Sequence, residues 1–213
     1  YFGNSKNEKC RVVVGKDTRL SSYMLESAIA SGLAASGADV YLLHVTTTPS
    51  VSYVTRTEGF DCGIMITASH NVFSDNGIKI ISSTGDKIGD DVIAMIEKYL
   101  DKEIPEVPFA TDSHIGKLID YAQGRNRYIG HLISIAAHSY KGMNIGLDCA
   151  NGSSWMIARS VFNALGANTF VINDTPSGEN INDNCGSTKI DQLVSLVKEK
   201  KLVYMLGETC YYY

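Results

Sequence analysis

One polar loop gathers side chains that could act as a nucleophile or handle a phosphate group. Ser69 supplies a hydroxyl, His70 an imidazole and Asn71 an amide at consecutive positions. Asn76-Gly77 is a turn signal that would bend the chain back and bring Lys79 toward Ser69. A hydroxyl, hydrogen-bond donors and an ammonium in one loop suit nucleophilic catalysis or the neutralisation of anionic oxygens.

A simple hairpin connection accounts for the same loop equally well. In that interpretation the polar residues of the segment 67–77 face water and do no chemistry. Ser-His-Asn alone is a weak motif, and the sequence contains neither a G-x-S-x-G elbow nor a P-loop. No Ser-His-Asp triad can be assigned either, so the residues of the loop leave both interpretations open.

The segment before the loop places it at the edge of a sheet. Cys62 to Thr67 is an apolar run typical of a strand buried on both faces. In open α/β sheets ligands bind at the carboxyl ends of the strands, and the loop follows such an end directly.

Strand and helix patterns alternate along the rest of the chain, which predicts a three-layer α/β fold with mixed, mostly parallel sheets. We predict strands over 11–14, 39–45, 62–67, 77–81 and 144–149, and helices over 25–33, from Pro49, over 90–100, over 117–137 and over 158–165.

Three short segments recur in the same order between 127 and 132 residues later. The pairs are Ser21–Met24 with Ser153–Met156, Gly37–Tyr41 with Gly166–Phe170, and Thr48–Ser50 with Thr175–Ser177. This repetition predicts two homologous α/β domains, one over 1–138 and a second, incomplete one over 139–213.

The composition is that of a soluble globular protein. Of the 213 residues 44% are hydrophobic and 20% charged. The 23 acidic and 19 basic residues give a net charge of -4, which disfavours nucleic acid as a partner. No apolar run approaches the ~20 residues of a membrane span, and the start shows no secretory signal. We therefore expect no membrane association and a cytoplasmic location.

The remaining reactive side chains predict little chemistry. The five cysteines are scattered without a C-x-x-C pair, so we expect neither disulfides nor a zinc site. Asp17 and Arg19 follow a strand and are equally consistent with a structural ion pair and with a role beside the cleft. The cysteines are Cys10, Cys62, Cys149, Cys185 and Cys210; the histidines expected to be solvated or locally hydrogen-bonded are His114, His131 and His138.

The loop and its surroundings resemble the α-D-phosphohexomutase family. Thr67–Asn71 followed by Asp75–Lys79 is similar to the phosphoserine loop of these enzymes. The resemblance extends from Arg11 to about Lys201. Segments similar to the bacterial phosphoglucosamine mutase branch of the family are Gly15–Ser21, Tyr23–Glu26, Thr48–Val51, Asp148–Gly152, Asn180–Asn182 and Asn184–Thr188.

This resemblance implies an enzyme that interconverts glucosamine 6-phosphate and glucosamine 1-phosphate through a bisphosphate intermediate, on the route to UDP-N-acetylglucosamine and the cell wall. Ser69 would carry the phosphoryl group, and Mg²⁺ would bind through that phosphate. Lys79 would help move the hydroxyl proton. His70 and Asn71 would orient the phosphate, and Arg19 would help to bind it.

The sequence also departs from the family pattern. Val72 stands where the family usually has proline. The family's Asp-Gly-Asp-x-Asp-Arg metal loop should follow the strand after Lys201, where this chain has Leu202–Gly207. The N-terminal arginine motif and the third and fourth domains are missing as well. We therefore expect an N- and C-terminally truncated piece, with Tyr211–Tyr213 as an odd terminus, that is inactive alone.

Two alternatives stay open at this point. The parent enzyme would be a phosphomannomutase or phosphoglucomutase, or the chain would be a non-catalytic phosphate-binding fragment. Self-association into a homo-oligomer through apolar surface also stays open.

Overall fold

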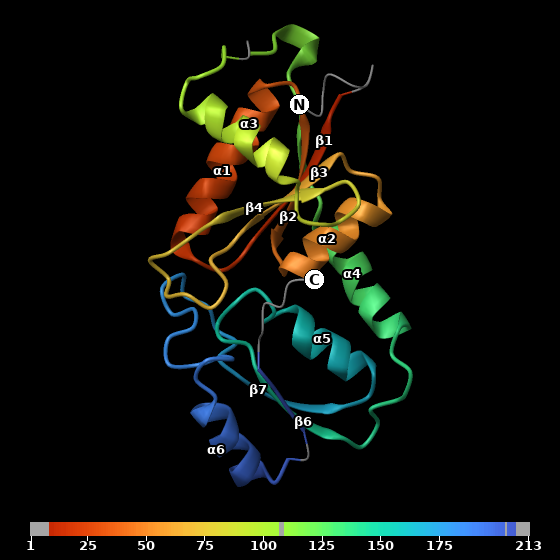
Figure 1. Cartoon of the computed structure of the whole chain (residues 1–213). Helices are drawn as coiled ribbons and strands as arrows, with labels where there is room; N and C mark the ends of the chain where they lie inside the picture. Colours follow the sequence, from red (N-terminus) through yellow and green to blue (C-terminus); the bar gives the residue numbers. More distant parts are fainter. Residues whose placement is uncertain (1–8, 107–108, 203, 208–213) are drawn as a thin grey trace.

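The computed structural model describes residues 9–106, 109–202 and 204–207, and it shows a mixed α/β fold with two sheets (Figure 1). The predicted fold class is therefore confirmed. Among these described residues, no helix combines the length and the apolar character that crossing a membrane would require.

The first sheet holds five strands in the order β4-β3-β1-β2-β5. β1 pairs in parallel with β2 and with β3, β2 pairs in parallel with β5, and only β4 runs antiparallel, against β3. The central position of β1 and β3 explains their nearly continuous burial. The strands are β1 (Arg11–Lys16), β2 (Asp39–Val45), β3 (Cys62–Ile66), β4 (Ile78–Ser82) and β5 (Leu118–Asp120).

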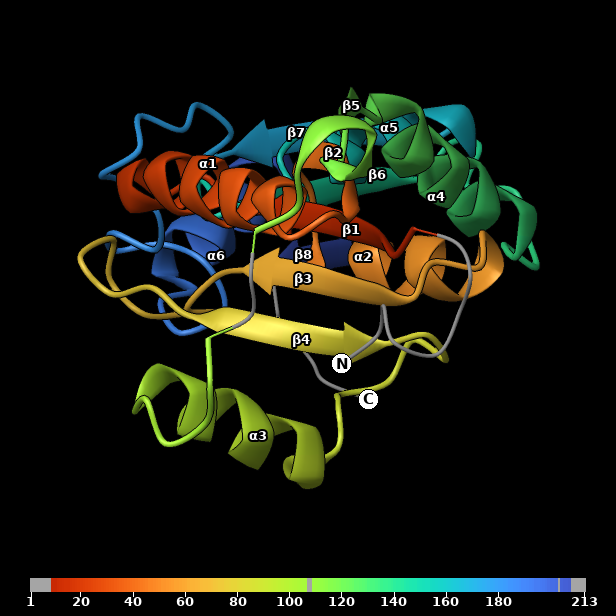
Figure 2. The same ribbon diagram turned by 90° about the horizontal axis from the view of Figure 1, so that it is seen from above.

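Helices cover both faces of this sheet (Figure 1). Ala30 of α1 packs with Val12 and Ile64 on one face. Val51 and Val54 of α2 join the core on the opposite face, and Figure 2 shows α3 on the β4 side of the sheet. The helices are α1 (Leu20–Ala35), α2 (Thr48–Thr57), α3 (Asp90–Leu100) and α4 (Ala122–Ser134).

The second sheet has the order β7-β6-β8 and is parallel throughout. Ile145 and Leu147 form the centre of its core. Its elements are β6 (Asn144–Asp148), α5 (Ile157–Ala164), β7 (Asn168–Ile172), α6 (Asp191–Lys200) and β8 (Tyr204–Gly207).

The two sheets share a topology, as an internal repeat predicts. The order β3-β1-β2 in one corresponds to β8-β6-β7 in the other, and each central strand pairs in parallel with both neighbours. The third repeated pair differs, because Thr48 begins α2 whereas Thr175 lies in the long connection between β7 and α6. The domain boundary at residues 138 and 139 stays a prediction.

The predicted helix over 117–137 is wrong in its first turn. Leu118–Asp120 instead forms β5, paired in parallel with β2, and helix α4 begins at Ala122. The backbone N–H of Val40 donates to the carbonyl oxygen of Lys117. Pairing with the open edge of the sheet therefore satisfies backbone hydrogen-bonding groups of this segment. The periodicity of apolar residues does not reveal such pairing.

Candidate active site

Three parallel strands end side by side at the sheet edge where the polar loop begins. Lys16, at the end of β1, pairs with Val45 of β2 and with Ile66 of β3. The loop 67–77 follows β3 at once and returns into β4, which pairs antiparallel with β3. The loop is thus both a hairpin connection and a part of the carboxyl edge of the sheet, where ligands of open α/β sheets bind.

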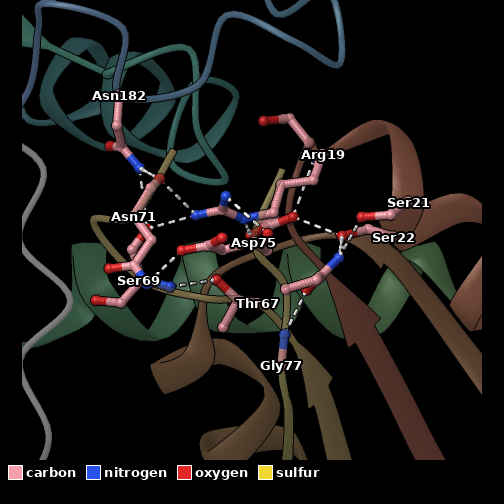
Figure 3. Close-up of polar contacts among 12 residues, drawn as sticks. Arg19, Ser21, Ser22, Thr67, Ser69, Asn71, Asp75, Gly77 and Asn182 are labelled. Carbon is pink, nitrogen blue, oxygen red and sulfur yellow. Dashed lines mark hydrogen bonds and ion pairs between the residues drawn. The ribbon is translucent and has the colours of Figure 1, made fainter. Parts of the chain in front are cut away.

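A fully buried guanidinium organises this loop (Figure 3). Arg19 has five N–H donors, and all of them have acceptors among the described residues. Nε donates to the carboxylate of Asp17 at 2.8 Å. The other donors reach loop carbonyl oxygens: Nη1 contacts Val72 and, at 3.0 Å, Asp75, and Nη2 contacts Ser69 and Asn71 at 3.0 Å each.

The carboxylate that pairs with Arg19 is itself fixed. Asp17 is buried, and its Oδ1 accepts from the Ser22 hydroxyl at 2.6 Å and from the backbone N–H of Arg19 at 3.0 Å. Asn76, near the end of the loop, donates to the hydroxyl oxygens of Ser21 and Ser22 at 2.9 Å. The start of α1 and the end of the loop are therefore one hydrogen-bonded network.

Ser69 itself is half-buried and has a left-handed backbone, with φ 57°. Its N–H donates to the hydroxyl of Thr67 at 3.1 Å. Its carbonyl oxygen accepts from Arg19 and also from the side-chain amide of Asn182, at 3.0 Å each. A non-glycine residue in this conformation costs of order 1–3 kcal/mol and persists when its surroundings fix it. These hydrogen bonds of Ser69 use its backbone, and its hydroxyl donates to none of the described residues.

His70, Asn71 and Lys79 are the other residues in and after the loop that were predicted to act in the site. His70 is exposed, and the Asn71 amide donates to the carboxylate of Asp75 at 3.0 Å. Lys79 lies on β4 opposite Met65 and lines a pocket of about 800 Å³ beside Pro49, whereas Ser69 does not line that pocket. The predicted approach of Lys79 to Ser69 stays a prediction.

The hydrogen bonds of Arg19 give it a structural task in the loop. Its five N–H groups are engaged in this arrangement and shape the loop, and its role in binding the phosphate stays a prediction. The ion pair weighed for Asp17 and Arg19 is present, and a role of these two residues beside the cleft stays a prediction. Residues that the sequence did not single out individually as loop contacts are Ser22, Asp75, Asn76 and Asn182.

The described residues do not form a site for Mg²⁺ by themselves. They contain no cluster of three or more histidine, cysteine, aspartate or glutamate side chains that could hold a metal ion. The loop offers one carboxylate, Asp75, which already accepts from Asn71. In place of the family's Asp-rich loop the sequence has Leu202–Gly207, of which Tyr204–Gly207 forms β8, and the predicted abrupt ends over 1–8 and 208–213 lie outside the described residues.

The thiols and histidines contribute no further centre. Cys62, Cys149 and Cys185 are buried and Cys10 is half-buried, and Cys210 lies outside the described residues. Burial raises the pKa of the Cys62 thiol to about 12. His131 stacks on the ring of Tyr53, with 4.4 Å between the ring centroids, so a ring contact takes the place of the solvated role expected for it.

Comparisons with known proteins show which family this chain is similar to. Residues 1–106 match the α/β/α domain I of the phosphoglucomutase/phosphomannomutase family. The chain is 60% identical over 203 residues to a phosphoglucosamine mutase of Lachnospira eligens, a match that covers 95% of this chain and 45% of that protein. A phosphoglucosamine mutase of Lachnoclostridium phytofermentans matches with 60% identity over 202 residues, again 95% of this chain and 45% of the relative.

The same fold occurs in a solved structure. A phosphoglucomutase/phosphomannomutase family protein from Burkholderia thailandensis superimposes with a TM-score of 0.78 at 22% identity, over 98% of this chain and 46% of that one. The chain therefore spans less than half the length of the proteins that it matches.

Proposed function

Because this chain belongs to the phosphoglucomutase/phosphomannomutase family, we propose that it supplies the phosphoserine loop of a phosphoglucosamine mutase. Ser69 is the residue that carries the phosphoryl group. The whole enzyme interconverts glucosamine 6-phosphate and glucosamine 1-phosphate through a bisphosphate intermediate, and its partner is a phosphorylated hexosamine. Relatives that share 60% identity and bear that name support the choice of sugar.

The observation that carries the proposal is the way in which the loop is held. Arg19 and Asn182 engage carbonyl oxygens of the loop, so the segment around Ser69 is fixed through its backbone. The Ser69 hydroxyl is engaged by none of the described residues. Phosphoryl transfer depends on positioning and on electrostatic stabilisation, and a fixed serine with an unengaged hydroxyl meets the first requirement.

The proposed transfer conserves its atoms and its proton. The bond between Ser69 Oγ and phosphorus breaks while a bond forms between phosphorus and a sugar hydroxyl oxygen, and the proton of that hydroxyl passes to Ser69 Oγ. In the second half the bond between the other phosphorus and its sugar oxygen breaks while Ser69 Oγ bonds to that phosphorus, and the Ser69 proton passes to the released sugar oxygen. Lys79 as the group that moves the proton stays a prediction, because its side chain lines the pocket beside α2. His70 and Asn71 as ligands of the phosphate stay predictions too.

Two further parts of the proposal concern the cofactor of the whole enzyme and its location and partners. Mg²⁺ as the cofactor is proposed for the whole enzyme, and we derive no step through it because the described residues do not form its site. A cytoplasmic location is proposed from the scattered cysteines. The absence of a nucleic-acid partner is proposed from the acidic composition, and that of a membrane partner from the lack of a long apolar run.

A hybrid enzyme tests the proposal. In it, this chain replaces the matched part of the Lachnospira eligens relative. We expect turnover of glucosamine 6-phosphate, phosphate on Ser69 by peptide mass spectrometry, and loss of both in Ser69→Ala. The matched control is Ser74→Ala, at an exposed position of the same loop, which keeps both. A clear preference for mannose or glucose phosphates over glucosamine phosphates would instead favour the phosphomannomutase or phosphoglucomutase alternative.

A further inference from the structure

Residues 11–134 form the first sheet with its helices and are called the first unit, and residues 144–207 form the second sheet with its helices and are called the second unit. Asn182 belongs to the second unit, yet its side chain contacts the loop 67–77 of the first unit (Figure 3). Its amide nitrogen donates to the carbonyl oxygens of Ser69 at 3.0 Å and of Asn71 at 2.9 Å. These are the two carbonyl oxygens that Arg19 Nη2 also contacts. Each of the two carbonyls therefore accepts one bond from each unit, which uses the two lone pairs that a carbonyl oxygen has.

We propose that Asn182 is a positioning residue, through which the second unit fixes the left-handed backbone of Ser69. Arg19 alone would hold the loop against the first unit, whereas the added amide makes the loop conformation depend on both units. That this matters for phosphoryl transfer rests on the function proposed above. The positioning itself follows from the contacts and does not depend on the substrate.

Asn182 is firmly attached to the second sheet. Its backbone N–H donates to the carbonyl oxygen of Ala150 at 2.9 Å, just after the end of β6. Its own backbone is left-handed, with φ 58°, a conformation that asparagine adopts more readily than most residues. The second sheet therefore presents the amide from a defined position.

The second unit also holds the segment that carries Arg19. The hydroxyl of Thr18 donates to the carbonyl oxygen of Asn151 at 2.6 Å, and the N–H of Leu20 donates to that of Gly178 at 2.9 Å. Both neighbours of Arg19 in the sequence are thus bonded to the second unit. The second unit contacts the loop and the residues that flank its anchor, so a displacement of that unit would disturb both.

The test compares two asparagines of one loop in the 213-residue chain. Asn182→Gly removes the amide while glycine tolerates the left-handed backbone. The matched control is Asn184→Gly, because Asn184 is also left-handed, with φ 50°, but donates to its neighbour Asp183. The measurement is amide hydrogen exchange at Asn71 and Asp75, whose N–H groups close turns within the loop.

We expect exchange at these two amides to rise on the order of tenfold in Asn182→Gly, the effect of losing one to two hydrogen bonds, and less than twofold in Asn184→Gly. The carbonyl ¹³C resonance of Ser69 should shift in the first variant only. Equal exchange in both variants, or an unshifted resonance, would overturn the positioning role.

Activity is then read in the Lachnospira eligens replacement enzyme. There Asn182→Gly should lower kcat about tenfold with KM within twofold, because the loop and not the sugar site is disturbed. Unchanged kcat would overturn the link to catalysis. If the parent replacement enzyme itself is inactive while the exchange results hold, the proposed function fails and the positioning role stands.

Discussion

At the scale of single residues, burying a guanidinium is costly unless every donor finds an acceptor. Arg19 is 0% exposed, and it is compensated by one carboxylate and four carbonyl oxygens. Hydrogen bonds with a charged partner are the strong ones, and the planar fork of arginine can serve several acceptors at once. The arrangement therefore needs arginine specifically and not merely a positive charge.

Arg19→Lys should consequently destabilise the fold. Lysine keeps the charge but has three donors on one nitrogen, so half-buried loop carbonyls and part of the buried Asp17 carboxylate lose their partners. We expect a loss of about 2–4 kcal/mol in the free energy of unfolding. Urea unfolding measures it. Arg159→Lys is the control, because Arg159 pairs with Asp174 while half exposed, and it should cost less than ~1 kcal/mol. Equal losses in the two variants would contradict the role given to Arg19.

The thiol of Cys62 yields a prediction about pH. Burial, together with the neighbouring Cys10 and Asp61, raises its pKa from 9.0 to about 12. The unfolded chain therefore releases this proton near pH 9 while the folded chain holds it. The contribution of Cys62 to stability is complete below pH 9 and declines as the pH rises toward 12.

Alkylation with iodoacetamide at pH 8, followed by peptide mass spectrometry, checks this difference. Cys62 should stay unmodified in the folded chain, because the thiolate is the reactive form and the buried thiol keeps its proton at pH 8. In denaturant Cys62 should react. Labelling of Cys62 in the folded chain at the rate seen in denaturant would show that the raised pKa is wrong.

At the scale of elements, close packing decides which glycines can be replaced. A Cβ on Gly63 of β3 would lie 2.3 Å from Thr55 Oγ1 and 3.0 Å from Val51 Cγ1. The hydroxyl of Thr55 is held in place because it donates to the carbonyl oxygen of Val51 at 2.7 Å. Helix α2 therefore approaches the sheet as closely as a glycine allows.

Gly63→Ala should lower the free energy of unfolding by about 1–3 kcal/mol, the usual cost of overpacking. Gly130→Ala is the opposite case, because a Cβ there meets nothing within 4 Å in the interior of α4. It should stabilise the chain by about 0.5–1 kcal/mol through helix propensity. Thermal unfolding of the two variants measures both shifts, and a stabilising Gly63→Ala would contradict the packing.

Elements with a strong local pattern could be predicted from the sequence, and contacts between distant segments could not. The strand at 39–45 and the helix at 90–100 have the predicted bounds, because apolar periodicity and turn residues define them locally. The helix predicted over 117–121 was wrong, because this segment pairs with the open edge of β2 in spite of the helical spacing of its apolar residues. The loop was found from its residue types, but its contacts with Arg19 and Asn182 join side chains to backbone carbonyls, which leave no mark in the sequence.

At the scale of the whole molecule, the described residues of the two units provide a positioned loop. The described residues hold no cluster for a metal ion, and the chain covers 45% of its 60%-identical relatives. We therefore predict that the 213-residue chain alone does not turn over glucosamine 6-phosphate. A coupled assay with the intact relative as positive control measures it, and turnover that survives removal of contaminating enzyme and is lost in Ser69→Ala would refute the prediction.

Arg19 and Asn182 bind the loop only through its backbone carbonyl oxygens, which every amino acid possesses. Val72 accepts from Arg19 through its carbonyl oxygen, a group that a proline at this position would also offer. A saturation library over 72–74 should consequently yield many folded members, and the tolerated diversity there could be used to retune what approaches the serine without rebuilding the frame around it.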